Sequence, residues 1–433
     1  MTYREAIDYL QNLTKFGFNF GLGRITELLR RFDNPHRKLR VIHIGGTNGK
    51  GSTTAMISSI LKESGYRAGA FTSPHLHSYT ERYSINGRHI TEEGLAGLIE
   101  EMKPHLEKMV EEGFEHPTEF EVGTAMAFLY FYREKVDFLV LEVGLGGAID
   151  STNVVVPAVS VITNVAMDHM DYLGNTIREI AGIKAGIIKK GVPVVTAATG
   201  EALDVILDRA GELEAPVTVV GRDVRWREAG CGVNGQKLDV HGLRGDYSDI
   251  FLPLLGGHQQ VNAATAIAAV EVLADLDLIK PGIAVKEGIA ATYWPARLEI
   301  INQSPVVVID AAHNYDGAVS LRRAIADYFP GKRVVLVIGM LGDKERSKVV
   351  AELAPSAAAV VVTKPNSPRA GDWEQMAVEA RRYVESVVTI EDIREAVRAG
   401  MDAAGPEDVV VITGSFYMVA EAREYFVNHF FRA

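Results

Sequence analysis

Residues 41–54 carry the side chains best suited to bind phosphate. The apolar run 41–44 predicts a strand, the letters G-G-T-N-G-K-G-S-T follow it, and an apolar pattern then predicts a helix. Glycines let successive backbone N–H groups approach an oxyanion, and the N-terminus of a helix adds positive charge. Lys50 would meet the outer phosphates, and Ser52 or Thr53 would place a hydroxyl on Mg²⁺. This order of strand, turn and helix predicts a nucleotide-phosphate site.

Two further polar groups follow apolar runs that predict buried parallel strands. Glu142 ends one run, and the pair Asp168-His169 follows the next run along the chain. Loops after parallel strands gather at one edge of a sheet, so we expect these side chains near the phosphate loop. A carboxylate suits Mg²⁺ and a neutral imidazole can ligate a divalent cation. These residues therefore predict a metal-assisted phosphate site.

Composition excludes several classes of protein. The formal net charge of −11, without a long basic run, disfavours a nucleic-acid partner. No apolar run approaches the roughly 20 residues that a membrane span needs, and the first residues lack the apolar core of a signal peptide. The single cysteine, Cys231, excludes an intrachain disulfide and favours a reducing compartment. We therefore expect a cytoplasmic protein that binds no membrane.

The elements that must position these residues suggest two domains, since 433 residues exceed the usual size of one core. We predict the α/β class, with an N-terminal P-loop ATPase domain of mostly parallel strands at residues 1–296. A smaller Rossmann-like α/β domain would follow at 297–433, after a proline at the boundary. Its strands are predicted near residues 306–310, 333–338, 358–363, 387–390 and 408–413.

Other segments are assigned less chemistry. Residues 3–13 predict an amphipathic helix, and the glycine-rich segment 17–23 predicts a turn. Residues 91–109 predict a charged helix with a solvated face, and 200–253 alternate short strand-like pieces with turns.

The ordered motifs resemble those of the ATP-dependent amide ligases that include the Mur ligases and the folylpolyglutamate/dihydrofolate synthases. The matching stretches are G-T-N-G-K-G-S-T, T-S-P-H-L at 72–76, T-N-V-x-x-D-H-x-D at 163–171, K-A-G at 184–186 and D-x-A-H-N-x-D at 310–316. The resemblance implies that L-glutamate is joined to a folate or dihydropteroate carboxylate through an acyl phosphate, giving ADP and phosphate. It also implies ATP as co-substrate, one or two Mg²⁺ ions and a monomer.

Residue roles follow from the same resemblance. The implied catalytic residues are Lys50, Lys184, His169 and His313. The implied ATP-binding residues are Thr47, Asn48, Gly49, Lys50, Gly51, Ser52, Thr53, Asn262, Arg297, Asp310 and His313. The implied metal-binding residues are Ser52, Ser73, Glu142 and His169. The implied substrate-binding residues are Ser73, Pro74, Arg82, Phe120, Asp150, Asn153 and Ser415.

Several of these interpretations have alternatives. Phe120 fits a core position as well as a pterin-stacking one, and Asn262 could cap a helix. The resemblance implies that Lys184 is carbamylated by CO₂ into an anionic group; unmodified, it would be a surface or phosphate-contacting cation. Ala148 stands where many members of the family carry arginine, and Ala296 where they carry glycine.

Other functions also remain open. One alternative is a Mur-type ligase of peptidoglycan precursors, which usually carries an extra N-terminal domain, whereas about forty residues precede this phosphate loop. A second alternative is a nucleotide-gated binding protein without turnover. The motifs do not separate dihydrofolate synthase from folylpolyglutamate synthase, or from an enzyme with both activities.

Overall fold

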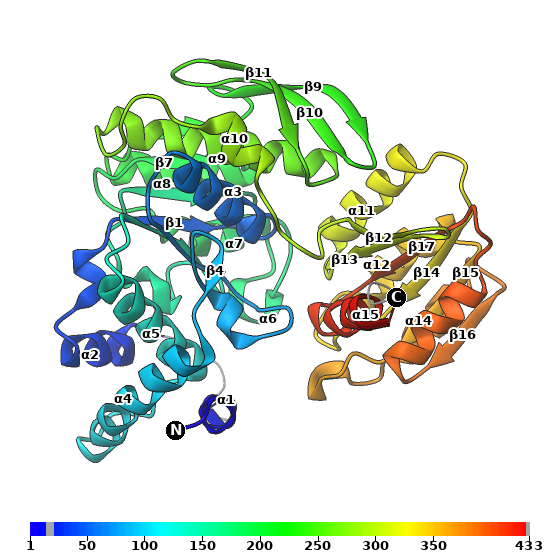
Figure 1. The fold of residues 1–433 in the computed structure, drawn as a ribbon, viewed down its shortest axis with the longest axis horizontal. Helices are drawn as coiled ribbons and strands as arrows, with labels where there is room; N and C mark the ends of the chain where they lie inside the picture. Colours follow the sequence, from blue (N-terminus) through cyan, green and yellow to red (C-terminus); the bar gives the residue numbers. More distant parts are fainter. Residues whose placement is uncertain (14–20, 430–433) are drawn as a thin grey trace.

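The computed structural model describes residues 1–13 and 21–429, so most of the turn predicted at 17–23 lies outside the described residues. Two halves, each built on a sheet, lie side by side and are joined by residues 291–298 (Figure 1). No helix in the described ranges combines the length and the apolar character needed to cross a membrane.

Within the described residues, the first half holds an eight-stranded sheet whose neighbouring strands pair in parallel except at one edge, where β3 pairs antiparallel with both β2 and β4. In sheet order, its strands are β4 (Arg88–His89), β3 (Tyr83–Ile85), β2 (Ala68–Phe71), β5 (Phe138–Glu142), β1 (Val41–Gly45), β6 (Val159–Ile162), β7 (Val194–Thr196) and β8 (Val217–Val219). The central strand β1 pairs with β5 in a register that sets Ile44 beside Glu142. The phosphate loop after β1 therefore starts next to that carboxylate.

Helices cover both faces of this sheet because successive strand residues point to opposite sides. Phe138 and Val140 of β5 belong to one apolar cluster, and Leu139 and Leu141 belong to the other. One face is covered by α3 (Lys50–Glu63), α9 (Gly257–Asp275) and α10 (Val285–Ala290). The opposite face is covered by α1 (Tyr3–Leu13), α2 (Gly23–Arg31), α4 (Glu92–Glu111), α5 (Glu119–Arg133), α7 (Ile177–Ala185) and α8 (Gly200–Glu212).

Two helix predictions for this half need correction. Residues 200–212, predicted as strand-like, form α8, because Ala202, Ile206 and Ala210 recur at four-residue steps and are buried. The helix α4 is not only a solvated face. Its apolar side chains, including Leu95 and Ile99, are buried in the first half.

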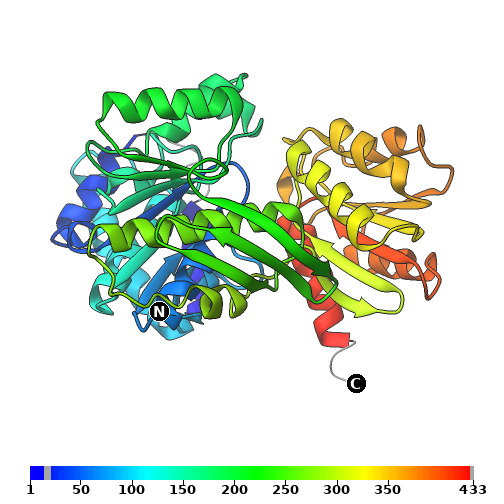
Figure 2. The same cartoon turned by 90° about the horizontal axis from the view of Figure 1, so that it is seen from above.

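A three-stranded antiparallel sheet lies above α9. Its strands are β11 (Asp246–Leu252), β10 (Gly235–His241) and β9 (Arg225–Gly232). Side chains of β10 and β11 share an apolar cluster with α9 and the main sheet, which explains why α9 is buried along nearly its whole length. Figure 2 shows this sheet extending toward the second half.

In the part of the chain that is described, the second half holds a six-stranded sheet. In sheet order, its strands are β12 (Glu299–Gln303), β13 (Val306–Asp310), β17 (Val409–Thr413), β14 (Val334–Ile338), β15 (Ala359–Thr363) and β16 (Val387–Ile390). The five predicted parallel strands are confirmed, whereas the antiparallel β12 was not predicted. One face is covered by α11 (Tyr315–Tyr328), α12 (Arg346–Leu353) and α13 (Gln375–Ala380), and the other by α14 (Ile393–Asp402) and α15 (Phe416–His429). The α/β fold class is confirmed.

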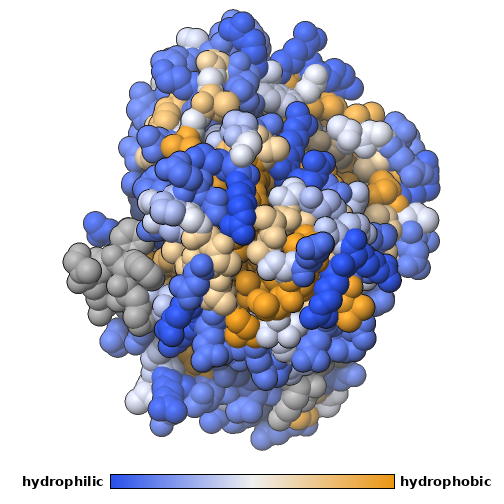
Figure 3. Space-filling model, turned by 90° about the vertical axis from the view of Figure 1, so that its right-hand side faces the viewer, coloured by the Kyte–Doolittle hydropathy of each residue, from blue (hydrophilic) through white to orange (hydrophobic). Residues whose placement is uncertain are grey.

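From the side of the second half, the surface is largely hydrophilic around a smaller apolar area (Figure 3). Exposed apolar side chains of this half include Val378, Tyr383 and Val388, the last on the outer strand β16.

Candidate active site

The phosphate loop is shaped by glycines at positions where a side chain has no room. Gly49 precedes α3 with a φ of +83°, and a Cβ there would lie 2.5 Å from Oδ1 of Asn262. Gly51 lies against the indole of Trp294, where a Cβ would be 2.7 Å from the ring. The extra glycine after Lys50 therefore allows Trp294, in the connection of residues 291–298, to pack on the loop.

The segment after β6, residues 163–166, is hydrogen-bonded to Thr47 and Asn48 of the phosphate loop. The hydroxyl of Thr47 accepts from the backbone N–H of Ala166 at 3.0 Å, and Asn48 N–H donates to Oδ1 of Asn164 at 2.8 Å. Thr163 Oγ1 donates to the carbonyl of Asn48 at 2.6 Å. The loop is thus held in one conformation by a neighbouring strand end.

Two lysines bring positive charge to this loop. Lys50 Nζ donates to the carbonyls of Gly46 and Thr47 at 3.2 and 3.0 Å, and Lys184 Nζ donates to Gly46 at 2.8 Å. Within the described residues, neither ammonium forms an ion pair. Burial, followed by the charge of Lys50, lowers the pKa of Lys184 to about 7. A substantial fraction of Lys184 is therefore a neutral amine near pH 7.

Glu142 lies at the centre of the site and is buried. Its Oε2 accepts from Ser73 N–H at 3.3 Å. Burial raises the pKa of its carboxyl to about 7, and the nearby cations Lys50 and Arg297 oppose that rise. The structure thus brings four predicted site residues from four segments to one place.

Asp168 gathers a second polar group. Its Oδ1 accepts from Lys344 Nζ at 2.6 Å, and Oδ2 accepts from Asn314 Nδ2 at 3.1 Å and lies 3.7 Å from His313 Nε2. Burial alone would raise the pKa of Asp168, but His313 and Lys344 hold it well below its usual range. Lys344 also lies 3.3 Å from Nε2 of His169, so that nitrogen already has a partner. Burial lowers the pKa of His169 to about 4, and its imidazole is neutral near pH 7.

The two halves touch through the phosphate loop itself. The amide Nδ2 of Asn48 donates to Asp316 at 2.8 Å, and Asn48 Oδ1 accepts from Asn314 Nδ2 at 3.0 Å. Residues of the D-x-A-H-N-x-D stretch in the second half are therefore hydrogen-bonded directly to the phosphate loop of the first half.

Arg297 lies near Glu142 and belongs to residues 291–298, which join the two halves. Its guanidinium lies 4.8 Å from the ring centre of Phe416, and it is close enough to Glu142 for each to affect the pKa of the other. Its neighbours Ala296 and Leu298 have φ values of 58° and 45°, in the left-handed region that residues with a Cβ seldom adopt. Asp310 accepts from the N–H groups of Leu298 and Ala312, both at 2.8 Å, and so supports this segment.

Predicted ATP-binding residues on α9 and α3 also lie close together. Ser52 Oγ accepts from Gln259 Nε2 at 3.2 Å, and Gln259 Oε1 accepts from Asn262 Nδ2 at 3.0 Å. The hydroxyl of Thr53 is buried and has no hydrogen-bond partner among the described residues.

The predicted substrate residues have partners within the protein. Arg82 pairs with Glu119 at 2.9 Å and lies over the ring of Tyr79. Phe120, in the first turn of α5, packs on Gly144, where a Cβ would lie 2.3 Å from its ring.

Three others support the backbone. Asp150 accepts from Leu145 N–H and Thr152 N–H at 2.8 and 2.9 Å, and Ser415 accepts from Met418 N–H at 3.2 Å. Asn153 Nδ2 donates to the carbonyls of residues 148 and 186, both at 3.2 Å. Of the substrate set, Ser73 contacts Glu142, and Pro74 beside it is exposed.

Sequence reasoning gave no role to several residues of this site. The most prominent is Lys344, which follows β14, and the others are Asn164, Gln259, Trp294, Asn314 and Asp316. Lys344 lies in a G-D-K stretch after a predicted strand, at the same sheet edge as Asp310. Its place after a predicted strand, at this sheet edge, could have identified Lys344 as a candidate site residue.

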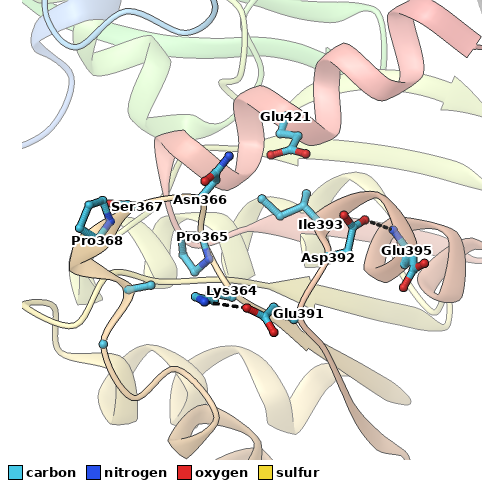
Figure 4. A pocket seen from close by; sticks show the side chains of 12 residues that line it. Lys364, Pro365, Asn366, Ser367, Pro368, Glu391, Asp392, Ile393, Glu395 and Glu421 are labelled. Carbon is cyan, nitrogen blue, oxygen red and sulfur yellow. Dashed lines mark hydrogen bonds and ion pairs between the residues drawn. The ribbon is translucent and has the colours of Figure 1, made fainter. Parts of the chain in front are cut away.

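A separate cavity of about 910 Å³ lies at the ends of β15 and β16 (Figure 4). Lys364 pairs there with Glu391 at 2.6 Å, and Asp392 accepts from the N–H of Glu395 at 2.9 Å. No predicted site residue lines it. Its excess of carboxylates, including Glu421, disfavours phosphate or glutamate as occupants.

Comparisons with known proteins show which family the chain resembles. The profile described as the Mur ligase middle domain matches residues 44–270, and the one described as the Mur ligase glutamate ligase domain matches residues 296–416. The chain is 39% identical to the dihydrofolate synthase/folylpolyglutamate synthase of Bacillus subtilis, over 98% of both chains.

Two solved structures are also similar. The folylpolyglutamate synthase of Mycobacterium tuberculosis complexed with ADP superposes with a TM-score of 0.91 at 36% identity, covering 98% of this chain and 99% of that one. Escherichia coli FolC in complex with DHPP and ADP gives a TM-score of 0.88 at 31% identity, covering 100% and 99%.

A phosphate loop on a parallel sheet, faced by a second α/β half, together with these matches, places the chain in the Mur ligase family, a class of ATP-dependent ligases. Within that class, it belongs to the folylpolyglutamate synthase/dihydrofolate synthase family.

Proposed function

We propose that this ligase joins L-glutamate to the carboxyl group of a folate or dihydropteroate, using ATP. The observation that carries the proposal is the 39% identity over 98% of both chains to a dihydrofolate synthase/folylpolyglutamate synthase. The substrate carboxylate takes the γ-phosphoryl group to form an acyl phosphate and ADP. The amine of glutamate then attacks the acyl carbon, and phosphate and a proton leave.

Charge explains how the site would favour the first step. A carboxylate and a triphosphate repel each other, so cations must neutralise the charge that develops between them. Lys50 supplies positive charge at the phosphate loop, without an ion pair among the described residues, and Arg297 adds a second cation from the connection between the two halves. Lys344 and His313, held by Asp168, would meet the acyl phosphate from the second half.

The donors fit a Mg²⁺ ion that is bound mainly by phosphate oxygens. Glu142 is a buried carboxylate with one backbone donor, and Ser52 lies in the first turn of α3. No cluster of three or more His, Cys, Asp or Glu side chains suited to a metal occurs in residues 1–13 and 21–429. That finding agrees with an ion held through few protein ligands, as is usual for Mg²⁺ with nucleotides. Glu142, Ser52 and Ser73 would hold the ion, which would neutralise phosphate charge when bound. His169 stays a candidate ligand, although its Nε2 lies 3.3 Å from Lys344.

Lys184 is proposed to carry a carbamate. A neutral Nζ forms a bond to the carbon of CO₂ and loses a proton, leaving an anionic group beside the metal site. The lowered pKa of Lys184 supports this reaction, because only the neutral amine is a nucleophile. Mass spectrometry under native conditions with ¹³C-bicarbonate would detect the added mass.

We place the domain boundary near residue 297, with ATP bound mainly by residues 1–296 and glutamate on the side of residues 297–433. Closure of the two halves would exclude water from the acyl phosphate before the amine arrives. Ser415 and Arg82 stay candidates for substrate contact, although both have partners within the protein.

A substrate panel tests the proposal. Purified protein is given ATP, Mg²⁺ and ¹⁴C-glutamate with dihydropteroate in one arm and tetrahydrofolate in the other, and labelled product and ADP are measured. Product in the first arm alone indicates dihydrofolate synthase, in the second alone folylpolyglutamate synthase, and in both a bifunctional enzyme. ATP binding without glutamate-dependent release of ADP in either arm would instead favour a nucleotide-gated binding protein.

A further inference from the structure

Arg423, on α15, connects three segments that meet at the domain interface. Its Nε and Nη2 donate to the two carboxylate oxygens of Glu299 at 2.8 and 2.9 Å. Nη2 also donates to the hydroxyl of Tyr293 at 2.8 Å, and Nη1 lies 3.2 Å from Nε2 of His77. One guanidinium therefore holds both ends of residues 293–299, here called the hinge segment, and reaches the loop after β2.

The hinge segment needs such support. Ala296 and Leu298 both have positive φ, which is unfavourable for residues with a Cβ. Glu299 accepts from the N–H of Ala296 at 2.8 Å while it pairs with Arg423. Arg423 therefore orients the carboxylate of Glu299, and this carboxylate holds the backbone N–H of Ala296, the residue before Arg297.

The loop of residues 72–78, here called the β2 loop, is anchored on its own domain. Glu81 accepts from three successive backbone N–H groups, those of Leu76, His77 and Ser78, at 2.7 to 2.9 Å. The side chain of Leu76 packs against an apolar cluster of the second half that includes Met418 of α15. The tip of the β2 loop thus packs on the second half through Leu76 and contacts α15 through His77.

Both connected segments lead to the same carboxylate. The β2 loop contains Ser73, whose N–H donates to Glu142, and the hinge segment carries Arg297, whose charge acts on Glu142. Among the described residues, the hydrogen bonds of Arg423 go to Glu299, Tyr293 and His77 and not to Glu142, Lys50 or the phosphate loop.

We propose that Arg423 is a positioning residue that holds the hinge segment and the β2 loop in one arrangement, so that Arg297 and Ser73 meet Glu142 together. It takes no part in bond making. This role rests on the proposed ligase function, because the arrangement matters for turnover only if the phosphate site is used.

The kinetic test compares Arg423→Ala and Arg423→Lys with Arg322→Ala. Arg322 pairs with Glu352 within the second half, so its loss removes an arginine ion pair without touching the interface. Loss of positioning should lower kcat of Arg423→Ala about 10-fold to 100-fold. The KM for ATP should stay within about twofold, since the phosphate loop remains intact. Arg423→Lys should recover part of kcat through one contact to Glu299, and Arg322→Ala should match wild type.

A second measurement needs no turnover. Small-angle X-ray scattering with a non-hydrolysable ATP analogue should give a larger radius of gyration for Arg423→Ala than for wild type and Arg322→Ala. If Arg423→Ala does not fold, His77→Ala breaks the link to the β2 loop alone and should shift kcat and scattering in the same direction. A folded Arg423→Ala or His77→Ala variant with wild-type kcat and scattering would overturn the proposal. Absence of glutamate-dependent turnover in wild type would count against the proposed function only, because the scattering comparison would still stand.

Discussion

The two parallel sheets present edges that satisfy their polar groups in different ways. At the edge of the first sheet, Lys50 and Lys184 donate to loop carbonyls and have no ion pair within the described residues. At the edge of the second sheet, Asp310 accepts two backbone N–H groups, and Asn314 and Ser415 accept from N–H groups at the starts of their helices. The first edge therefore carries unmatched charge, whereas the second is largely satisfied by its own backbone.

We propose that the first edge binds the ligand and that the second edge supports it. Buried cations without counter-charges cost stability, and they are retained where a ligand later supplies the opposite charge. We propose that the second half acts on the ligand through His313 and Lys344, and that Arg297 does so from the connection between the halves. Substitutions at the first edge should therefore affect activity most, and substitutions at the second should affect stability.

The largest effect is expected from Lys50→Ala. Removal of this cation should lower kcat by about 10²–10³-fold, because a preorganised charge at the transferring phosphoryl group is lost. The fold should survive, since Lys50 bonds only to carbonyls of its own loop. Glutamate-dependent release of ADP measures kcat, and circular dichroism measures whether the fold survives. Lys62→Ala, on the exposed part of the same helix, is the control, and full turnover in Lys50→Ala would refute the assignment.

Lys184→Met should show an intermediate loss of activity together with a gain in stability. The pKa of Lys184 is about 7 in the folded protein, against 10.5 for a lysine exposed to water, so the unfolded chain binds more protons between these pH values. The free energy of unfolding of wild type should therefore rise from pH 7 toward pH 10.5, and the cost of burying the amine is complete below pH 7. Methionine removes this cost, so the variant should exceed wild type most at pH 6.5 and least at pH 9.5.

Urea unfolding at these two pH values in CO₂-free buffer measures that difference. Lys190→Met, at an exposed lysine nearby, should show neither the gain nor its pH dependence. Activity of Lys184→Met should fall about 10²-fold, as for loss of a preorganised charged group. A variant less stable than wild type at pH 6.5 would show that Lys184 is stabilising in its buried position.

Much of this fold could be predicted because its signals are local. Each of the five parallel strands of the second sheet is an apolar run bounded by turn residues, and its position follows from the sequence to within one residue. The strand β12 lacks that signal, because Glu299, Asn302 and Gln303 interrupt it and its pairing with β13 supplies its order. The helix at residues 200–212 was missed because its buried face consists of few apolar residues.

The site could be predicted only where one segment carries a whole motif. The phosphate loop and Glu142 fall at strand ends and are visible in the sequence, whereas the contacts of Asn48 with Asn314 and Asp316 join residues more than 260 positions apart. The roles of Arg423 and Glu81 likewise depend on packing between segments. Such contacts have no periodic or compositional signature, so one sequence does not reveal them.

The smallest effect is expected at the boundary between the two edges, from Ala296→Gly. The left-handed φ of 58° at Ala296 costs about 1–2 kcal/mol for a residue with a Cβ, and glycine removes that cost. Glycine also adds about 0.5–1 kcal/mol of entropy cost on folding, so the net gain should be about 0.5–1 kcal/mol. Ala291→Gly is the matched control, because Ala291 lies at the end of α10 with a φ of −86° and should only lose stability. Thermal unfolding of both variants measures the contrast. Equal losses in the two would mean that the hydrogen bonds from Glu299 and Asp310, and not the left-handed backbone, set the energy of the segment that carries Arg297.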